Sequence, residues 1–329
     1  MKRIIVSAAK KAAMLVVSVL VLSLIVFLMA RVAPGDPLVA YYGDRAEKMT
    51  TEEKDQTRER LGLDRPVLVQ YGVWLENAVQ GDFGISYKYK QDVMEVVGER
   101  AGNTLLLGGI GFALTFLLSL LLGRYCAERE GRISDKICCQ LGTVSSCIPT
   151  FWLALMLILL FGVLLGILPT SGAYDVGKDG DILSRLLHLI LPMAVLVLSH
   201  LWYYAYMIRN KLCDEIRQDY VLFERAKGFD MKTIVRRHCM RNIMPSYVSL
   251  MAVSVPHILG GTYIIEMVFS YPGLGTLAFE SAKYHDYNML MIVCLITGTA
   301  VIICNMIGQI INERIDPRMR AANRGREVY

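Results

Sequence analysis

The sequence lacks the short motifs that mark most hydrolase and metal sites. It contains no HExxH, no GxSxG and no cluster of His, Asp and Glu at ligand spacing, so no machinery for hydrolysis is visible. Its eight cysteines are scattered, and no CxxC pair is followed by a second pair, which argues against a disulfide framework or a zinc site. We therefore expect a chain that is not an enzyme and that holds no cofactor or metal of its own.

Charge is also scarce over long stretches of the chain. Hydrophobic residues make up 54% of the 329 and the mean hydropathy is +0.41, so a soluble fold would have to bury far more apolar surface than is usual. A helix that crosses a membrane needs about 20 largely apolar residues. Six runs meet this requirement, near residues 12–30, 103–123, 137–165, 186–207, 243–268 and 289–311. The composition thus predicts an all-α membrane protein with six transmembrane helices.

The distribution of basic residues predicts the orientation of these helices. A net charge of +5 could indicate a nucleic-acid partner, but Lys and Arg in a hydrophobic chain more often mark loops on the cytoplasmic side. With the amino terminus inside, the four inner segments carry 22 of the 35 Lys and Arg residues. Both termini are therefore expected in the cytoplasm. The first apolar run has no small-residue cleavage site after it, so it is interpreted as an uncleaved helix.

The region 31–102 is too charged to cross the membrane and is predicted to form an outer domain between the first two helices. Three clusters of turn-forming residues divide it, at 34–37, 62–66 and 81–84. Between the first two, Thr51 to Leu61 has the pattern of a short charged helix that ends at Gly62. The expected domains are 1–102 for the first helix and outer domain, 103–311 for the transmembrane core and 312–329 for a cytoplasmic tail.

One stretch comes close to a phosphate-binding loop. Residues Gly172 to Lys178 supply its glycines and lysine, but Asp179 stands where a Ser or Thr would hold magnesium. The predicted topology also places this stretch outside, away from ATP. We attribute the match to chance.

The longest inner segment, Arg209 to Asn242, carries the functional inference. It divides at Gly228 into two predicted helices, the first capped by Asp219 and the second by Asp230. The first helix presents four residues at three- and four-residue spacing, namely Tyr220, Phe223, Glu224 and Lys227. This aromatic and charged face suits a groove of a partner protein or an anionic lipid surface, and the pattern alone favours neither.

The stretch from Asp219 to Phe229, with Arg236-Arg237-His238 and Arg241 to Pro245 after it, resembles the EAA loop of ABC importer permeases, in the form found in the oligopeptide, dipeptide and nickel group. Eight further blocks typical of this group occur in order along nearly the whole chain. They are APGDP at 33–37, GLDRP at 62–66, GDFGIS at 81–86, TL at 104–105, IPTFW at 148–152, LPTSG at 168–172, FSYPGLG at 269–275 and DPR at 316–318. The chain departs from the general pattern at 222–224, where Leu, Phe and Glu replace Glu, Ala and Ala.

The resemblance implies the permease subunit of an ATP-driven importer of peptides in a prokaryotic cytoplasmic membrane. Such a permease pairs with a second, homologous permease, rests on two cytoplasmic ATPases that bind ATP and Mg, and receives cargo from an outer substrate-binding protein. The APGDP block and long outer region resemble the permease named first in such pairs. The residues that the resemblance assigns to coupling with the ATPases are Tyr220, Phe223, Glu224, Arg225, Ala226, Lys227 and Gly228.

Other interpretations stay open on the sequence. The same fold could carry nickel or a metal chelate, and an intramembrane enzyme or a membrane scaffold would be different classes altogether. The enzyme lacks motifs, and the scaffold leaves the predicted hairpin unexplained. His257, beside Pro256 in the fifth apolar run, is either a packed, hydrogen-bonded histidine or a contact on the transport pathway.

Overall fold

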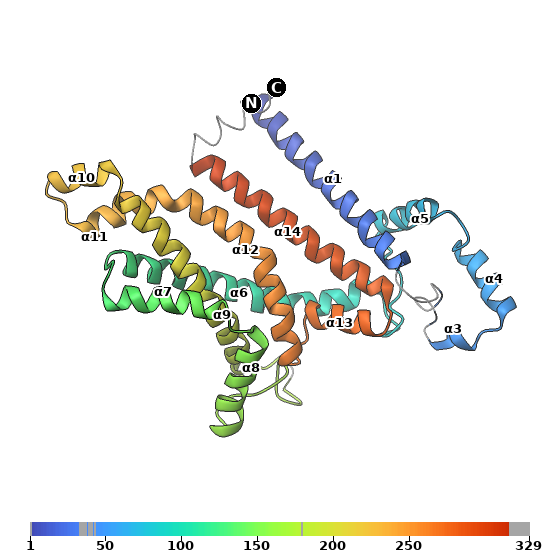
Figure 1. Cartoon of the computed structure of the whole chain (residues 1–329). Coiled ribbons are helices and arrows are strands. Elements are labelled where there is room, and N and C mark those ends of the chain that lie inside the picture. The colour runs from blue at the N-terminus through green and yellow to red at the C-terminus, as the bar shows by residue number, and fades with distance from the viewer. Residues whose placement is uncertain (1, 33–37, 39–41, 43, 179, 316–329) are drawn as a thin grey trace. The chain divides into compact units, whose positions relative to one another are not determined.

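The computed structural model describes residues 2–32, 38, 42, 44–178 and 180–315, and its regular elements there are helices (Figure 1). The helices are α1 (Lys2–Val32), α3 (Asp44–Lys48), α4 (Thr51–Leu61), α5 (Val67–Val79), α6 (Val93–Ala127), α7 (Ile133–Ser145), α8 (Thr150–Leu157), α9 (Ile182–Ile216), α10 (Asp219–Ala226), α11 (Met231–Ile234), α12 (Met240–Val268), α13 (Leu274–Lys283) and α14 (Tyr287–Ile315). Two π-helical stretches, η1 (Ile158–Leu164) and η2 (Val235–Cys239), continue α8 and α11. The all-α prediction is thereby confirmed for the described residues. Asp179 and the sequence blocks at 33–37 and 316–318 lie outside the described residues.

Among the described residues, five helices are long and apolar enough to cross a membrane. Their membrane-compatible ranges are Lys11–Val32, Val93–Ala127, Ile182–Ile216, Met231–Val268 and Tyr287–Ile315. These ranges coincide with five of the six apolar runs in the sequence. Several of these helices extend beyond the apolar runs by two or more turns. The backbone groups of the polar residues that flank the runs continue the hydrogen bonding of the helix.

The third apolar run, 137–165, does not form one continuous helix. α7 ends at Ser145, α8 begins at Thr150, and the two helical segments are bent by 107°. Pro149 occupies the position before α8, where its missing N–H and its restriction of the preceding residue end a helix. If this bent pair is one span, the described residues contain six.

Backbone contacts divide the chain into two compact units, one made of Met1–Asn103 with Pro272–Ile303 and the other of Thr104–Tyr271 with Cys304–Tyr329. The first unit has a core in which the start of α6 packs on α13 and α14. The buried residues of this core are Val93, Val96, Val97, Leu274, Leu277, Met289, Ile292 and Val293. In this unit a charged helix was expected to end at Gly62, and α4 does so, with Gly62 in the left-handed conformation at φ 66°.

The segment 81–92, called here the outer loop after the side that the sequence predicts for it, is fastened to α13 and to the start of α14. Ser86 Oγ donates a hydrogen bond of 2.5 Å to Asp286 Oδ2, and Tyr89 Oη donates one of 2.5 Å to Glu280 Oε2. Burial, followed by the hydrogen bond to Glu280, raises the pKa of the Tyr89 hydroxyl. The outer loop is therefore positioned by two carboxylates of its own unit.

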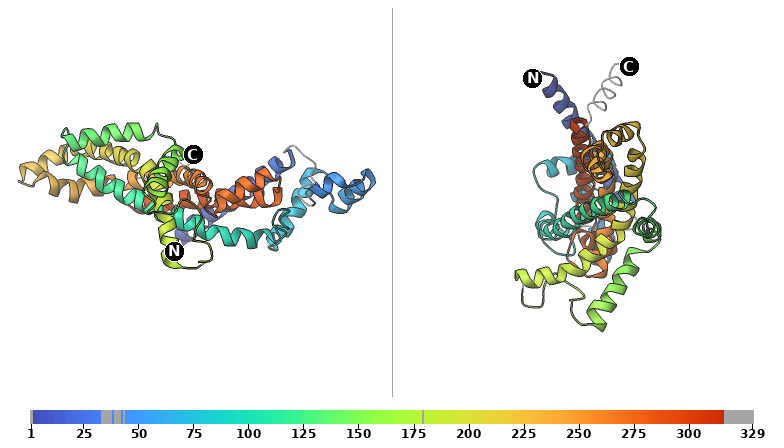
Figure 2. Two further views of the ribbon diagram at one scale, coloured as in Figure 1. Left: turned by 90° about the horizontal axis from the view of Figure 1, so that it is seen from below. Right: turned by 90° about the vertical axis from the view of Figure 1, so that its left-hand side faces the viewer.

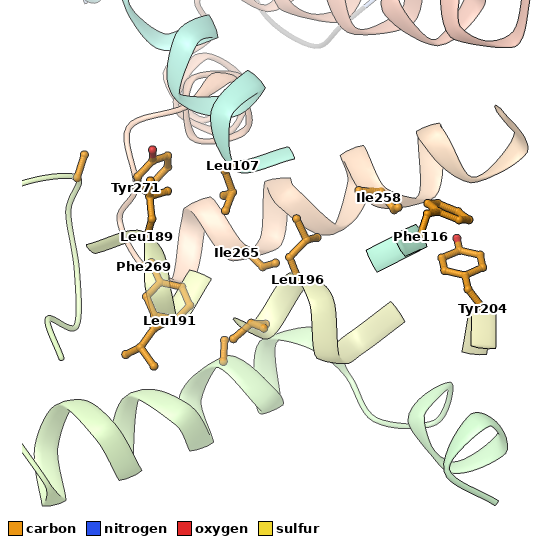
Figure 3. Close-up of a cluster of buried hydrophobic side chains, with 13 residues drawn as sticks. Leu107, Phe116, Leu189, Leu191, Leu196, Tyr204, Ile258, Ile265, Phe269 and Tyr271 are labelled. Carbon is orange, nitrogen blue, oxygen red and sulfur yellow. The ribbon is translucent and has the colours of Figure 1, made fainter. Parts of the chain in front are cut away.

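The core of the second unit is built from α6, α9 and α12 (Figure 3). Its largest buried side chains include Leu107, Phe116, Leu189, Leu191, Leu196, Tyr204, Ile258, Ile265, Phe269 and Tyr271. Two glycines allow α9 to approach its neighbours closely. A Cβ atom on Gly111 would lie 2.2 Å from Leu196 Cδ2, and one on Gly261 would lie 3.1 Å from His200 Cε1. Small residues at such crossings are typical of helix packing in membranes.

Candidate coupling hairpin

The end of α9 carries the hairpin and is tied to α7. α9 runs to Ile216, so the predicted inner segment begins as a continuation of a transmembrane helix and not as a loop. Arg209 donates two parallel hydrogen bonds to Asp135 of α7, Nε to Oδ1 and Nη2 to Oδ2, both 2.7 Å long. Arg217 lies 2.7 Å from a carboxylate oxygen of Glu130. These ion pairs fix the base of the hairpin to the α6–α7 connection.

The coupling hairpin, residues 218–239, consists of α10, a turn at Gly228, α11 and η2. Gln218, and not the expected Asp219, precedes α10, while Asp230 stands before α11 as predicted. The hydroxyl of Thr233 lowers the pKa of the Asp230 carboxyl. In Figure 1 and in the left view of Figure 2 the hairpin extends beyond the α6–α7 connection.

Gly228 ends α10 in the way the sequence predicts. Its φ is +91°, in the left-handed region that only glycine enters at little cost. The Gly228 N–H donates to Arg225 O at 2.9 Å and the Phe229 N–H to Glu224 O at 3.3 Å, the two hydrogen bonds of a Schellman motif. A Cβ atom at Gly228 would meet no atom within 4 Å. The position therefore favours glycine because of its backbone conformation, and not because neighbouring atoms leave no room for a side chain.

The inner face of the hairpin packs on the last turns of α9 and the first of α12. The buried residues of this cluster are Ala127, Ile208, Leu212, Cys213, Val221, Ile234, Val235, Cys239 and Ile243, with Tyr220 partly buried against them. Contact along both arms couples the hairpin to two long helices.

Glu215 connects the two arms of the hairpin at its base. One of its carboxylate oxygens, Oε1, accepts hydrogen bonds of 2.8 Å from Tyr220 Oη and from Asn242 Nδ2. Tyr220 Oη also lies 3.4 Å from Cys239 Sγ. Burial raises the pKa of the Tyr220 hydroxyl, and its hydrogen bonds to Cys239 and to Glu215 raise it further. No sequence motif indicates this network, because its members come from four separate helical elements, α9, α10, η2 and α12.

The outer face of the hairpin exposes apolar side chains. Leu222 is 63% exposed and Phe223 61%, and Arg225, Ala226 and Gly228 are also exposed. Lys227 Nζ lies 2.9 Å from Glu224 Oε1 and 4.1 Å from the centre of the Phe223 ring. The structure thus separates the predicted coupling residues, since Tyr220 turns inward while the other six lie on or beside the exposed end of the hairpin.

His257 lies on an exposed part of α12, away from the hairpin. Its ring centre is 5.9 Å from that of His200 on α9, and the rings are nearly perpendicular. His200 is buried and its Nδ1 lies 2.9 Å from Leu196 O. Among the described residues the His257 ring has no hydrogen-bond partner of its own, so the packed and hydrogen-bonded histidine of this pair is His200.

The stretch Gly172 to Lys178, whose sequence is similar to a phosphate-binding loop, makes polar contacts within its own part of the chain. Lys178 Nζ lies 3.1 Å from Asp175 Oδ2, and this hydrogen bond lowers the pKa of the Asp175 carboxyl. The Asp175 N–H donates to Ser184 Oγ at 2.8 Å. Over the described ranges, with their gaps, no three His, Cys, Asp or Glu side chains gather where they could hold a metal ion.

Comparison with protein families decides the class of the chain. Residues 119–321 match the family model of the binding-protein-dependent transport system inner membrane component, and residues 1–108 match the model of its N-terminal part. The chain belongs to this family. It is a multi-pass transport permease of the ABC importers, in the group that includes peptide permeases.

Relatives of this permease cover nearly its whole length. The oligopeptide transport system permease protein AppB of Bacillus subtilis is 33% identical over 91% of this chain and 94% of its own. The metal-staphylopine import system permease protein CntB of Staphylococcus aureus is 31% identical over 96% of this chain and 98% of its own. Among solved structures, the MetNI methionine ABC transporter in an inward-facing conformation aligns with a TM-score of 0.54 at 18% identity, over 68% of this chain and 97% of the other. The last comparison shows the shared fold.

Proposed function

We propose that this permease moves oligopeptides or dipeptides across the cytoplasmic membrane of a prokaryote in an ATP-driven importer. The support is its 33% identity to an oligopeptide permease over 91% of the chain, together with a similar match to a putative peptide permease of Brucella ovis at 34% over 92%. The match to the metal-staphylopine permease at 31% supports a metal chelate as the second candidate cargo.

The proposed complex contains this chain, a second homologous permease, two ATPases and an outer substrate-binding protein. ATP and Mg are held by the ATPases, so this chain carries no cofactor. The APGDP block at 33–37 and the long outer region favour the role of the first permease of the pair. His257, exposed on α12, is the candidate for a pathway contact.

The proposed topology has six spans, with α7, α8 and η1 together as the third and both termini in the cytoplasm. It is supported by the 22 of 35 basic residues that then lie inside. The outer region between α1 and α6 faces outward and the coupling hairpin lies between the fourth and fifth spans. Cysteine accessibility tests this, because Lys88→Cys should react only from outside and Lys227→Cys only from inside. The reverse pattern would overturn the topology.

Coupling is proposed to pass through the hairpin to α9 and α12. The exposed Phe223, Ala226 and Lys227 contact an ATPase, and the buried inner face transmits its movement, since both arms pack on long helices. Closure of the ATPases around ATP then changes the side to which the pathway opens. The change is a two-state switch biased by a partner.

The experiment that tests this function is uptake by the reconstituted importer. The five components are assembled in vesicles with ATP inside, and uptake of labelled di- to pentapeptides is compared with uptake of a nickel chelate. We expect peptide uptake that depends on ATP and on the binding protein. Uptake of the chelate alone would replace the peptide by the second candidate, and uptake of neither would contradict the proposal.

A further inference from the structure

α5 in the first unit exposes an unusually apolar surface. Of its thirteen residues only Glu76 is charged, and none is buried. Leu68 is 69% exposed and Val79 82%. Apolar surface of this kind on a folded protein marks contact with another molecule or with a membrane.

α5 is held against the transmembrane helix α1 by aromatic and polar contacts (Figure 1). The Tyr71 hydroxyl lies 2.8 Å from Ser23 Oγ and 3.3 Å from Leu20 O. The Phe27 ring centre is 5.5 Å from that of Tyr71 and 5.9 Å from that of Trp74. All these partners lie within the range Lys11–Val32 that is apolar enough to span the membrane.

The position of these contacts along α1 sets their depth. At about 1.5 Å per residue, Phe27 lies about 8 Å and Leu20 about 18 Å from the end of the span at Val32. Half of the hydrocarbon layer is about 15 Å thick. With Val32 taken as the end of the span, the contacts therefore lie at the level of the hydrocarbon layer and not above the membrane. α1 exposes apolar side chains over the same stretch, including Val21, Ile25 and Met29.

One side of α5 carries its two amide residues, and Val69 and Val73, each 45% exposed, lie between that side and the side of Leu68. Leu68, Leu75 and Val79 are seven and four residues apart, so they share one face. Gln70 and Asn77 are seven apart and lie on the opposite face. The side of α5 that faces α1 lies between the side of Leu68 and the side of Gln70. It carries Tyr71 and Trp74, which are residue types that favour the boundary between lipid and water.

We propose that α5 is an interfacial helix embedded in one leaflet of the bilayer, with Leu68 and Val79 in lipid and Asn77 towards water. Lipid is the occupant because α5 contacts α1 within the range that is apolar enough to span the membrane, where α1 also exposes Val21, Ile25 and Met29. The contact with lipid rests only on α1 being a span, while its assignment to the outer leaflet rests on the topology proposed above. A part of the region predicted to be an outer domain then belongs to the membrane.

Site-specific photo-cross-linking in the assembled importer tests the occupant directly. p-Benzoylphenylalanine replaces Leu68, Val79 or, as the matched control on the opposite face, Asn77. Met29 of α1, 69% exposed on a span, supplies the reference for lipid contact. The importer is reconstituted in phosphatidylglycerol and phosphatidylethanolamine vesicles with the binding protein present, and adducts are identified by mass spectrometry. Peptide uptake by each variant is measured in parallel.

We expect lipid adducts at positions 68 and 79 at a yield comparable with position 29, and at least about fivefold lower at 77. Adducts of positions 68 and 79 with the binding protein or with the second permease would overturn the proposal, because the face would then be a protein interface. Equal lipid yields at 68 and 77 would also overturn it. A sample that forms the expected lipid adducts but takes up no peptide would contradict the proposed cargo and leave the lipid contact established.

Discussion

The outer loop and the coupling hairpin are both fastened by carboxylates, but they expose different kinds of surface. In the outer loop the polar side chains turn inward onto Asp286 and Glu280 of the same unit. In the hairpin, Glu215 secures only the base, and the apolar Leu222 and Phe223 face outward. The outer loop is thus completed within the chain, whereas the hairpin leaves an apolar surface exposed, which we propose an ATPase covers.

This contrast predicts different consequences when each region is altered. A change in the hairpin should alter coupling to the ATPases with little loss of fold. A change in the outer loop should lower stability and leave the ATPases engaged. The following variants, ordered from the largest expected effect, test that difference.

Gly228→Val is expected to abolish uptake while the protein still inserts. A β-branched residue in the left-handed conformation costs more than about 1–2 kcal/mol, so the turn between α10 and α11 should reorganise. Gly228→Asn is the matched control, since Asn tolerates this conformation and the space around Gly228 is open. Uptake, stimulated ATP hydrolysis and cross-linking of Ala226→Cys to the ATPase are the measurements. Normal uptake by Gly228→Val would show that the hairpin does not couple.

Glu215→Ala should reduce stimulated ATP hydrolysis about tenfold. The Tyr220 hydroxyl and the Asn242 amide lose their shared acceptor, which costs about 1–3 kcal/mol and frees the two arms of the hairpin. Glu215→Gln keeps an acceptor oxygen and should retain most of the activity. If Gln and Ala behave alike while the melting temperature falls equally in both, the role of Glu215 is confined to stability.

Asp286→Ala is the corresponding change in the outer loop. Asp286 is fully buried and accepts hydrogen bonds from Ser86 Oγ and from the Lys88 N–H, so its loss should lower the free energy of unfolding by about 1–3 kcal/mol. Asp286→Asn should lower the free energy of unfolding by less. Thermal unfolding in detergent measures the effect, and cross-linking of Ala226→Cys to the ATPase should not change. A loss of that cross-link would erase the distinction between the two regions.

The smallest effect concerns the pH dependence of the contact at Glu280. Burial alone would raise the pKa of this carboxyl, but the hydrogen bonds from Lys88 and Tyr89 outweigh it and hold the pKa below its ordinary value of 4.5. A depressed pKa in the folded state stabilises the protein above pH 4.5 and ceases to do so as pH falls through the folded value. The stability difference between the wild type and Glu280→Gln should therefore shrink below pH 4.5. A stability difference that does not change with pH would contradict a lowered pKa at Glu280.

The long uncharged runs made five of the spans predictable, and the broken third run shows where such prediction ends. Pro192, Pro245 and Pro256 lie inside α9 and α12, whereas Pro149 stands at a corner between two helices. Proline ends a helix unless neighbouring groups satisfy the carbonyl that it frees, and those neighbours belong to the tertiary structure. The sequence around each proline therefore could not distinguish the cases.

The turn of the hairpin was predictable, but the contacts that hold it were not. Gly228 and Asp230 carry local signals, because a left-handed stop and an N-cap depend on the residue itself. The bonds of Glu215 to Tyr220 and Asn242 depend on how α9, α10 and α12 meet. The pair of Arg209 and Asp135 joins residues 74 positions apart. The α5 contact with α1 was missed in the same way, because region 31–102 as a whole is charged.

The Arg209–Asp135 pair also sets an order of events during synthesis. Asp135 leaves the ribosome 74 residues before its partner, and a carboxylate buried without a counter-charge costs several kcal/mol. α7 therefore reaches its final packing only after α9 has been made. The hairpin closes later still, when Asn242 emerges and reaches Glu215. The hairpin of a nascent permease is thus completed only after α9 and the start of α12 have both been made.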